Sequence, residues 1–174
     1  LPVSAYFSSQ VLQAEIERLF SVEPRYAGHE LLVPNLHDYF VLPHHHNGLA
    51  IVRNENGVDV LSNVCKHRQA TILQGHGNAK RMSCPMHRWT YDTHGKLLVA
   101  PHFAQEPCPS PNLQRFPTES WNGLQFIGAP GRLRELQDIP ARAKGLLNFD
   151  SYYFGHHEVH ECSYNWKTFI EFYL

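Results

Sequence analysis

Hydrophobic residues near the start of the chain recur at steps of three and four, the spacing that places side chains on one face of a helix. The apolar positions of this stretch are Val11, Leu12, Ile16, Leu19 and Phe20. Ser8 or Ser9 can cap the first turn, and Pro24 stops the helix. Residues 8–20 are therefore predicted to form an amphipathic helix that docks on a neighbouring element and carries no chemistry.

From residue 26 onward the pattern changes to short apolar runs separated by glycine, proline and asparagine, which is typical of β-strands joined by turns. The predicted strands are 30–33, 39–42, 49–53, 58–64, 89–92, 96–99, 121–128 and 149–161. Turns are expected at 54–57, which ends in an Asn-Gly pair, at 75–78 and at 93–95. Prolines scattered over residues 101–117 exclude a central strand and indicate an extended cover. The predicted fold is mainly β, small and antiparallel.

These signals divide the chain into three regions. Residues 1–35 form an N-terminal helical segment, residues 36–145 form the β domain, and residues 146–174 begin a further domain of α+β character. Residues 162–174 run apolar to the last position without a stop signal, so we expect the native chain to continue beyond Leu174.

Composition and charge exclude several classes of protein. Apolar residues make up 43% of the 174, enough for a packed core. The net charge of −1, without a basic tract, argues against nucleic acid as a partner. No apolar run reaches the roughly 18 residues of a membrane span, and the first residues lack a secretion signal. Cys108 and Cys162 are expected to be reduced thiols, which favours a cytoplasmic location.

Residues 65–87 contain the clearest chemical pattern. Cys65 and His67 form one arm, and Cys84 and His87 form a second arm, with sixteen residues between the two arms. Structural zinc sites more often pair Cys with Cys within an arm, whereas a Rieske-type [2Fe-2S] cluster takes two thiolates on one iron and two imidazoles on the other. We predict that these four residues bind the metals of such a cluster. A Cys2His2 zinc site in an interaction module is the alternative.

Charge then predicts what such a cluster does. Two ferric ions and two sulfides sum to +2, so two thiolates and two neutral imidazoles make the oxidised cluster neutral, unlike a cluster with four thiolates. An electron enters a neutral centre more easily, so the expected potential lies in the window of roughly −150 to +300 mV. The cluster is a one-electron relay that needs a donor and an acceptor.

With their flanks, the two arms resemble the Rieske domain of ring-hydroxylating non-haem iron oxygenases, in which they read Cys-x-His-Arg and Cys-x-x-His-x-Trp. Arg68 and Trp89 occupy the matching places here. Rieske proteins of respiratory complexes have two further cysteines, and Ala70 and Met86 stand at those positions, so their disulfide cannot form. Its absence should place the potential in the lower part of the range. Arg68 and Arg88 are candidates for binding carboxylates or a neighbouring subunit.

The resemblance covers nearly the whole chain and points to the large (α) subunit. Gly28-His29-Glu30 and Trp89-Thr90-Tyr91-Asp92 match it, although Met86 replaces a tyrosine common in oxygenases. Asn165-Trp166-Lys167 with Glu171 resembles the segment that opens the catalytic domain. Residues 146–174 would then begin a catalytic domain whose iron ligands lie beyond Leu174, leaving no catalytic residue in this sequence.

The resemblance implies an oxidoreductase in two parts. NADH reduces a reductase, in some cases through a ferredoxin, and electrons pass through the Rieske cluster to a mononuclear Fe(II) that activates O2. The family carries out dihydroxylation, monohydroxylation or demethylation, often in aromatic hydrocarbon catabolism, and commonly assembles as a homotrimer with or without a β subunit. A stand-alone Rieske ferredoxin, an electron carrier without catalysis, is the main alternative.

Other histidines have simpler interpretations. On a strand, His156, Glu158 and His160 would share a face and could imitate an iron site with two histidines and a carboxylate. We expect a solvated face instead, and a polar loop for residues 44–46. Trp89 is expected to pack in the core beneath the second arm.

Overall fold

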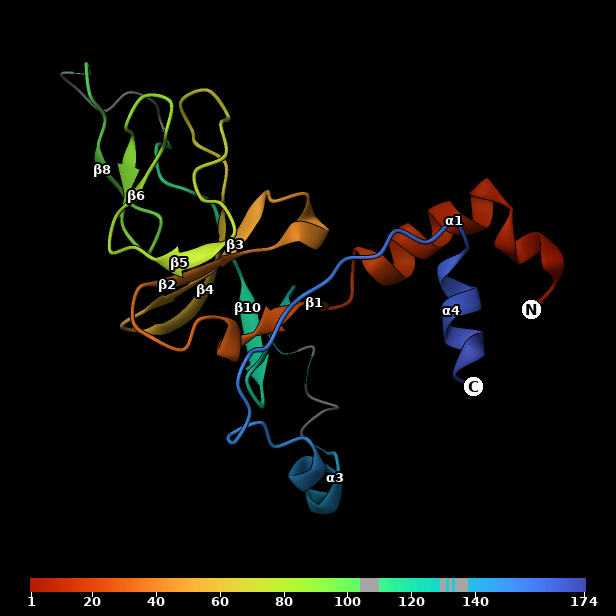
Figure 1. Cartoon of the computed structure of the whole chain (residues 1–174). Coiled ribbons are helices and arrows are strands. Elements are labelled where there is room, and N and C mark those ends of the chain that lie inside the picture. The colour runs from red at the N-terminus through yellow and green to blue at the C-terminus, as the bar shows by residue number, and fades with distance from the viewer. Residues whose placement is uncertain (104–109, 129–130, 132, 134–137) are drawn as a thin grey trace. The chain divides into compact units, whose positions relative to one another are not determined.

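The computed structural model of the protein describes residues 1–103, 110–128, 131, 133 and 138–174. The chain forms two compact units, shown with their elements in Figure 1. The larger unit comprises residues 24–155, and the smaller unit contains both ends of the chain, residues 1–23 and 156–174. Among the described helices, none combines the length and apolar character that crossing a membrane requires.

A five-stranded antiparallel sheet forms the centre of the larger unit, with the strand order β5-β2-β3-β4-β9. Its strands are β2 (Asp38–Val41), β3 (Leu49–Asn54), β4 (Gly57–Ser62), β5 (His76–Asn78) and β9 (Arg115–Phe116). The β3–β4 hairpin pairs without interruption to Asn54↔Gly57 and closes at the predicted turn. β4 leads directly to the first ligand arm.

Two three-stranded sheets complete this unit, with the orders β1-β11-β10 and β6-β7-β8. Their strands are β1 (Arg25–His29), β10 (Thr118–Trp121), β11 (Leu124–Ile127), β6 (Met82–Ser83), β7 (Thr90–Tyr91) and β8 (Leu97–Val99). Since β6 ends at Ser83 and β7 begins at Thr90, these two paired strands hold the ends of the second arm.

The described helices are short. They are the 3-10 helices η1 (Val3–Tyr6), η3 (Glu30–Leu32) and η4 (Pro43–His45), the π-helix η2 (Ile16–Phe20), and the α-helices α1 (Ser9–Glu15), α3 (Ala141–Leu146) and α4 (Trp166–Phe172). The predicted helix over 8–20 is thus present, with Ser8 as its cap, but its second half is wound as a π-helix.

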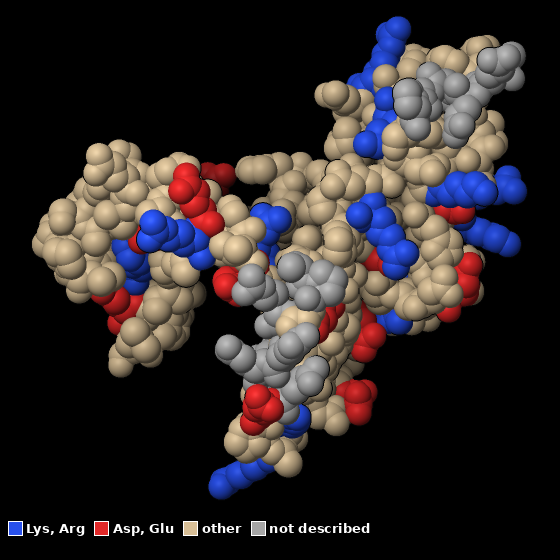
Figure 2. Space-filling model, turned by 180° about the vertical axis from the view of Figure 1, so that it is seen from behind, with Lys and Arg blue, Asp and Glu red and all other residues tan. Residues whose placement is uncertain are grey.

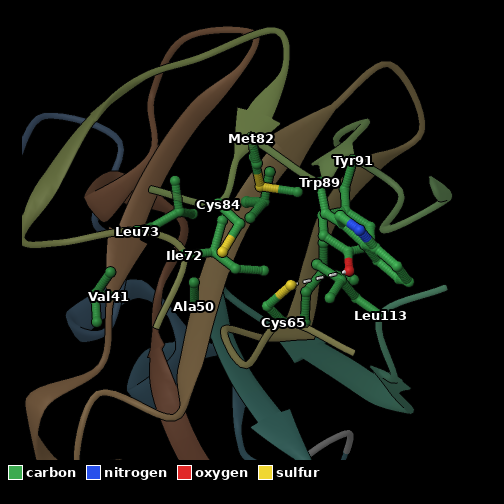
Figure 3. Close-up of a cluster of buried hydrophobic side chains, with 12 residues drawn as sticks. Val41, Ala50, Cys65, Ile72, Leu73, Met82, Cys84, Trp89, Tyr91 and Leu113 are labelled. Carbon is green, nitrogen blue, oxygen red and sulfur yellow. Dashed lines mark hydrogen bonds between the residues drawn. The ribbon is translucent and has the colours of Figure 1, made fainter. Parts of the chain in front are cut away.

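The central sheet buries both of its faces, because side chains alternate along its strands. Ala50 and Val52 of β3 enter one hydrophobic cluster, whereas Ile51 between them enters another. The first cluster also contains Cys65 and Cys84 together with residues of the β6-β7-β8 sheet (Figure 3). The ligand arms are therefore anchored in the core of the unit and not only in surface loops.

The strand predicted over 121–128 is confirmed for Leu124–Ile127, but its first residues belong to a hairpin that the prediction missed. β10 ends at Trp121 and β11 begins at Leu124, with Asn122 and Gly123 in the turn at φ of +48° and +80°. Asn-Gly is the preferred pair for a two-residue turn in which both residues have positive φ. The apolar residues on both sides concealed this turn signal.

Two other predicted strands are wrong. Residues 30–32 form a 3-10 turn because the ring of His29 accepts a hydrogen bond from the backbone of Leu31 at 3.1 Å. Residues 149–161 contain no strand; near their start Phe154 places its ring 5.4 Å from that of Phe40. Partial alternation of apolar and polar residues is not enough to form a strand, because the backbone N–H and C=O groups of a strand must pair with the edge of a sheet.

The smaller unit is held together by polar contacts between the two ends of the chain. The ammonium group of Lys167 donates to Glu15 at 2.7 Å, and the Trp166 indole donates to the second oxygen of the same carboxylate at 3.1 Å. Only 7% of the Lys167 side chain and 13% of the Glu15 side chain are exposed. The ring of Phe20 packs edge-on against Trp166. These contacts join helices that lie about 150 residues apart in sequence.

We predict that acid loosens this smaller unit. The hydrogen bonds from Lys167 and Trp166 lower the pKa of Glu15 below its usual range. A carboxylate with a lowered folded-state pKa stabilises fully above its unfolded value of about 4.3, and this contribution is lost as the pH falls through the folded-state pKa. Hydrogen exchange of the Trp166 indole N–H should therefore accelerate as the pH falls below about 4.

The matched control is Glu17→Gln, which removes a neighbouring exposed carboxylate that bonds only Gln13 among the described contacts. Glu15→Gln should abolish most of the pH dependence, and Glu17→Gln should retain it. Equal pH dependence in both variants would show that Glu15 is not the responsible group.

Candidate metal centre

The two arms form loops of the same backbone geometry. In the first loop the N–H of Gln69 donates to the Cys65 carbonyl at 2.9 Å, and the N–H of Cys65 donates to the Ala70 carbonyl at 2.9 Å. In the second, the N–H of Arg88 donates to the Cys84 carbonyl at 3.0 Å, and the N–H of Cys84 donates to Trp89 at 2.8 Å. Each bond in one loop thus has its counterpart in the other.

A left-handed residue closes each loop. The φ angles are +56° at Gln69 and +59° at Arg88. Residues with side chains seldom adopt this conformation, and it costs about 1–2 kcal/mol each. Two equivalent strained turns next to two buried cysteines indicate a site in which the backbone sets the positions of the cysteine side chains.

The two thiols are buried and face the same space between the loops (Figure 3). Cys65 and Cys84 are each 1% exposed, and no disulfide joins them. Burial raises the pKa of the Cys84 thiol, the N–H groups of Met86 and His87 lower it, and the adjacent Cys65 raises it. N–H groups directed at a sulfur stabilise it as a thiolate, which is the form that binds metal.

The two imidazoles lie together. The ring centroids of His67 and His87 are 4.7 Å apart, and the rings are inclined at 74°. Nδ1 of His67 is buried without a hydrogen-bond partner in the described structure. Burial lowers the pKa of His67, and the neighbouring His87 and Arg68 lower it further, so this ring is neutral at pH 7. A neutral imidazole with an unpartnered buried nitrogen is suited to bind a metal.

The four side chains are two thiols and two imidazoles, the donor set of a Rieske-type [2Fe-2S] cluster. Across the described ranges, no three or more His, Cys, Asp or Glu side chains are grouped so that they could hold one metal ion. In a two-iron cluster the thiolates bind one metal and the imidazoles the other, so pairs suffice. The donor set is therefore consistent with the predicted [2Fe-2S] group.

Tyr91 is a site residue that the sequence prediction missed. Its hydroxyl lies 3.5 Å from Sγ of Cys65, and its oxygen accepts the N–H of Lys66 at 3.3 Å (Figure 3). Burial raises the pKa of Tyr91 far above its usual range, so the hydroxyl keeps its proton and can donate to the sulfur. At position 86, where related oxygenases commonly have a tyrosine, Met86 is 63% exposed.

Trp89 is buried as predicted, and it also contacts the first arm. Its ring is stacked on that of His67 with a centroid distance of 5.0 Å and an angle of 5° between planes. The indole thus shields one face of His67 from water. By contrast, His87 is exposed, so its ring is open to a partner.

The other candidate residues lie outside this site. His156 and His160 are exposed and approach Glu158 at 3.8 and 3.1 Å, but they are not on a strand. Residues 43–45 form the 3-10 turn η4 in place of a plain loop. Cys162 is exposed and reduced, and Cys108 lies outside the described residues.

Comparison with known proteins gives a consistent result. A family model for the Rieske [2Fe-2S] domain matches residues 27–117. The chain is 52% identical over its whole length to putrescine 2-hydroxylase of Ralstonia nicotianae, covering 47% of that protein, and 43% identical to putrescine 2-hydroxylase of Bordetella bronchiseptica, covering 43%. It is 33% identical to the biphenyl 2,3-dioxygenase α subunit of Rhodococcus jostii over 69% of this chain and 25% of that one.

Solved structures confirm the predicted mainly β fold. The quaternary ammonium Rieske monooxygenase CntA, in complex with L-carnitine, superposes with a TM-score of 0.80 at 24% identity, over 98% of this chain and 51% of the CntA chain. The chain spans about half the length of the relatives that it matches along its whole sequence.

In protein loaded with a [2Fe-2S] cluster, Tyr91→Phe should lower the reduction potential. The hydroxyl donates to a sulfur that becomes more negative on reduction, so it stabilises the reduced state more. A differential of about 1 kcal/mol corresponds to ~40 mV for one electron. A spectroscopic redox titration measures this shift. Tyr26→Phe, on strand β1, is the control and should leave the potential unchanged; equal potentials in all three proteins would contradict the role of Tyr91.

Proposed function

The chain belongs to the Rieske [2Fe-2S] domain family, and we propose that it is the electron-relay part of the large subunit of a Rieske oxygenase. Its proposed cluster ligands are Cys65, His67, Cys84 and His87. The observation that carries this assignment is the pair of equivalent loops, which bring together two buried thiols and an imidazole nitrogen without a partner.

The bound cluster would supply one-electron transfer, and the residues of this chain supply its setting. The loop N–H groups and the Tyr91 hydroxyl hold the negative charge of the sulfurs. Trp89 covers one face of His67 and excludes water. The exposed ring of His87 is the route by which an electron, and a proton on its free nitrogen, can reach a partner.

An oxygenase is favoured over a stand-alone Rieske ferredoxin because the similarity extends beyond the cluster domain. The two putrescine 2-hydroxylases match all of this chain, including the ends that form the smaller unit. An electron carrier alone would have no need of those segments. The expected electron source is NADH through a reductase or ferredoxin, and the expected acceptor is a mononuclear Fe(II) in the remainder of the full-length protein. The homotrimer and a β subunit stay predictions.

For the substrate, we propose an aliphatic amine in place of the aromatic ring that the sequence resemblance implied. The supporting observation is the gradient of similarity: 52% and 43% identity over the whole chain to hydroxylases named for putrescine, against 33% over part of it to a biphenyl dioxygenase. The net reaction would consume one O2, two electrons and two protons and yield a hydroxylated amine and one water. An aromatic substrate is the second candidate.

The ligand assignment predicts the metal content of single variants. Purified protein should hold the two irons of the cluster in each chain, in addition to the mononuclear iron of a full-length chain, and show a Rieske-type electron paramagnetic resonance signal after reduction. Cys65→Ser or Cys84→Ser should retain at least tenfold less iron, since even loss of a hydrogen-bond partner behind a ligand costs about 10–100-fold in metal affinity. Cys162→Ser is the matched control, because this thiol is exposed, and it should keep both irons. Colourless protein with one zinc per chain would refute the assignment.

The substrate proposal predicts a preference that steady-state kinetics can measure. Full-length protein with a reductase and NADH should consume O2 with putrescine at a kcat/KM at least about tenfold higher than with biphenyl, since a site built for a polar group discriminates strongly against apolar analogues. Product analysis must show stoichiometric hydroxylation, because uncoupled O2 consumption would otherwise imitate turnover. The reverse preference would restore the aromatic substrate.

A further inference from the structure

Three buried side-chain atoms differ from the polar groups around them, because in the part of the chain that the structure describes they have no hydrogen-bond partner. They are Nδ1 of His37, Nδ1 of His67 and Nε1 of Trp89. The His67 nitrogen is accounted for by its proposed role as a cluster ligand. The indole nitrogen of Trp89 can only donate, and a buried donor without an acceptor is costly and rare in native proteins. The indole N–H therefore indicates an acceptor that is not a protein group.

The indole is enclosed by aromatic rings and held beside the ligand residues. Trp89 is 2% exposed, so bulk water does not reach its N–H group. Its ring lies parallel to that of His67, and the ring of Phe103 packs edge-on against both, with centroid distances of 5.5 Å to Trp89 and 5.8 Å to His67. Trp89 belongs to the same buried cluster as Cys65 and Cys84 (Figure 3). Stacking thus fixes the orientation of the indole at the site.

Charged side chains of the ligand loops do not provide this acceptor. Residues 60–91, which include both loops, contain no Asp or Glu. Their charged residues are all exposed, and these are Lys66, Arg68, Lys80, Arg81 and Arg88. Figure 2 shows blue side chains that project outward from the lobe of the ligand loops. Ammonium and guanidinium groups donate hydrogen bonds and cannot accept them, so they leave the indole N–H unpaired.

The two cysteine sulfurs already have donors of their own. The Tyr91 hydroxyl lies 3.5 Å from Sγ of Cys65, and backbone N–H groups of the second loop are directed at the Cys84 sulfur. Neither sulfur accepts from Trp89 in the described structure. A [2Fe-2S] cluster bound by these cysteines brings two further acceptors, its bridging sulfides. A sulfide therefore matches the donor that remains.

We propose that the indole N–H of Trp89 donates a hydrogen bond to a bridging sulfide of the bound cluster. The inference rests on the proposed function, because it requires the cluster. Reduction adds one electron, which makes the sulfides more negative, and a hydrogen bond to a more negative acceptor is stronger. Trp89 therefore stabilises the reduced cluster and raises its potential. It acts on a sulfide, whereas Tyr91 acts on a cysteine sulfur, so the two residues tune the potential through different atoms.

The test removes the N–H group and keeps the stacked ring. In full-length protein with its cluster, Trp89 is replaced by benzothienylalanine, in which a sulfur atom stands in place of the indole N–H. A redox titration followed by electron paramagnetic resonance should show the equilibrium constant for one-electron reduction falling about fivefold, which is ~40 mV at about 59 mV per tenfold. Trp89→Phe should lower the potential as well. Trp121→Phe, on strand β10, is the control and should leave it unchanged.

A second measurement detects the hydrogen bond directly. Electron-nuclear double resonance of the reduced cluster, recorded in H2O and in D2O, reports the exchangeable protons that are coupled to it. One of these couplings should be lost in the benzothienylalanine variant and retained in Trp121→Phe. The face of the Phe103 ring is the rival acceptor, since an N–H group can point at an aromatic ring. In a Phe103→Leu background, replacing the indole should still lower the potential by the same amount.

The outcomes separate this proposal from the proposed function. Unmodified protein that dithionite does not reduce to a Rieske signal would overturn both. A normal signal, with the same potential and the same proton couplings in the benzothienylalanine variant, would overturn the hydrogen bond alone. So would a shift in Trp89→Phe without one in the benzothienylalanine variant, because stacking on His67 would then be the cause. Loss of the shift in the Phe103→Leu background would assign the N–H to that ring and also overturn the proposal.

Discussion

The site depends on two short loops whose backbones follow the same hydrogen-bonding pattern. In each loop one N–H returns to the carbonyl of the cysteine, the cysteine N–H bonds the residue that follows, and Gln69 or Arg88 adopts a left-handed conformation. The hydrogen bonds and the burial of Cys65 and Cys84 in the core cluster offset the conformational energy of these left-handed residues. Each loop is thus held at its cysteine by backbone hydrogen bonds and by burial of that cysteine in the core.

Burial explains why the charge of the bound group matters. Two thiolates that are 1% exposed would be very costly without compensation. Two ferric ions and two sulfides cancel their charge, so the oxidised cluster can remain within apolar surroundings, and one added electron leaves a single negative charge. N–H groups at Cys84 and the hydroxyl of Tyr91 are available to hold that charge. The Lys and Arg side chains of the ligand loops remain outside, where water solvates them.

The sequence predicted those features that depend on local spacing. The two arms, the mainly β class and the β3–β4 hairpin could be predicted from the sequence, because the spacing of ligands and a short turn depend only on neighbouring residues. Tyr91 was missed since its approach to Cys65 spans 26 residues and follows from the pairing of β7 with β6. The turn at Asn122-Gly123 carried a signal that the apolar neighbours outweighed. The contact of Glu15 with Lys167 was invisible, because 152 positions separate the partners.

Tyr91 also changes the expectation for the potential of the cluster. Ala70 and Met86 exclude the disulfide that braces some Rieske centres, and on that ground the potential should be low. Here, however, Met86 points to solvent and the phenol is supplied from β7, behind the first arm, where its proton can reach Cys65. A donor to a thiolate favours the reduced state, so Tyr91 opposes the effect of the missing disulfide. A relay must accept an electron from a donor and pass it to an acceptor, so a change at Tyr91 that shifts the potential alters the driving force of both transfers with opposite sign.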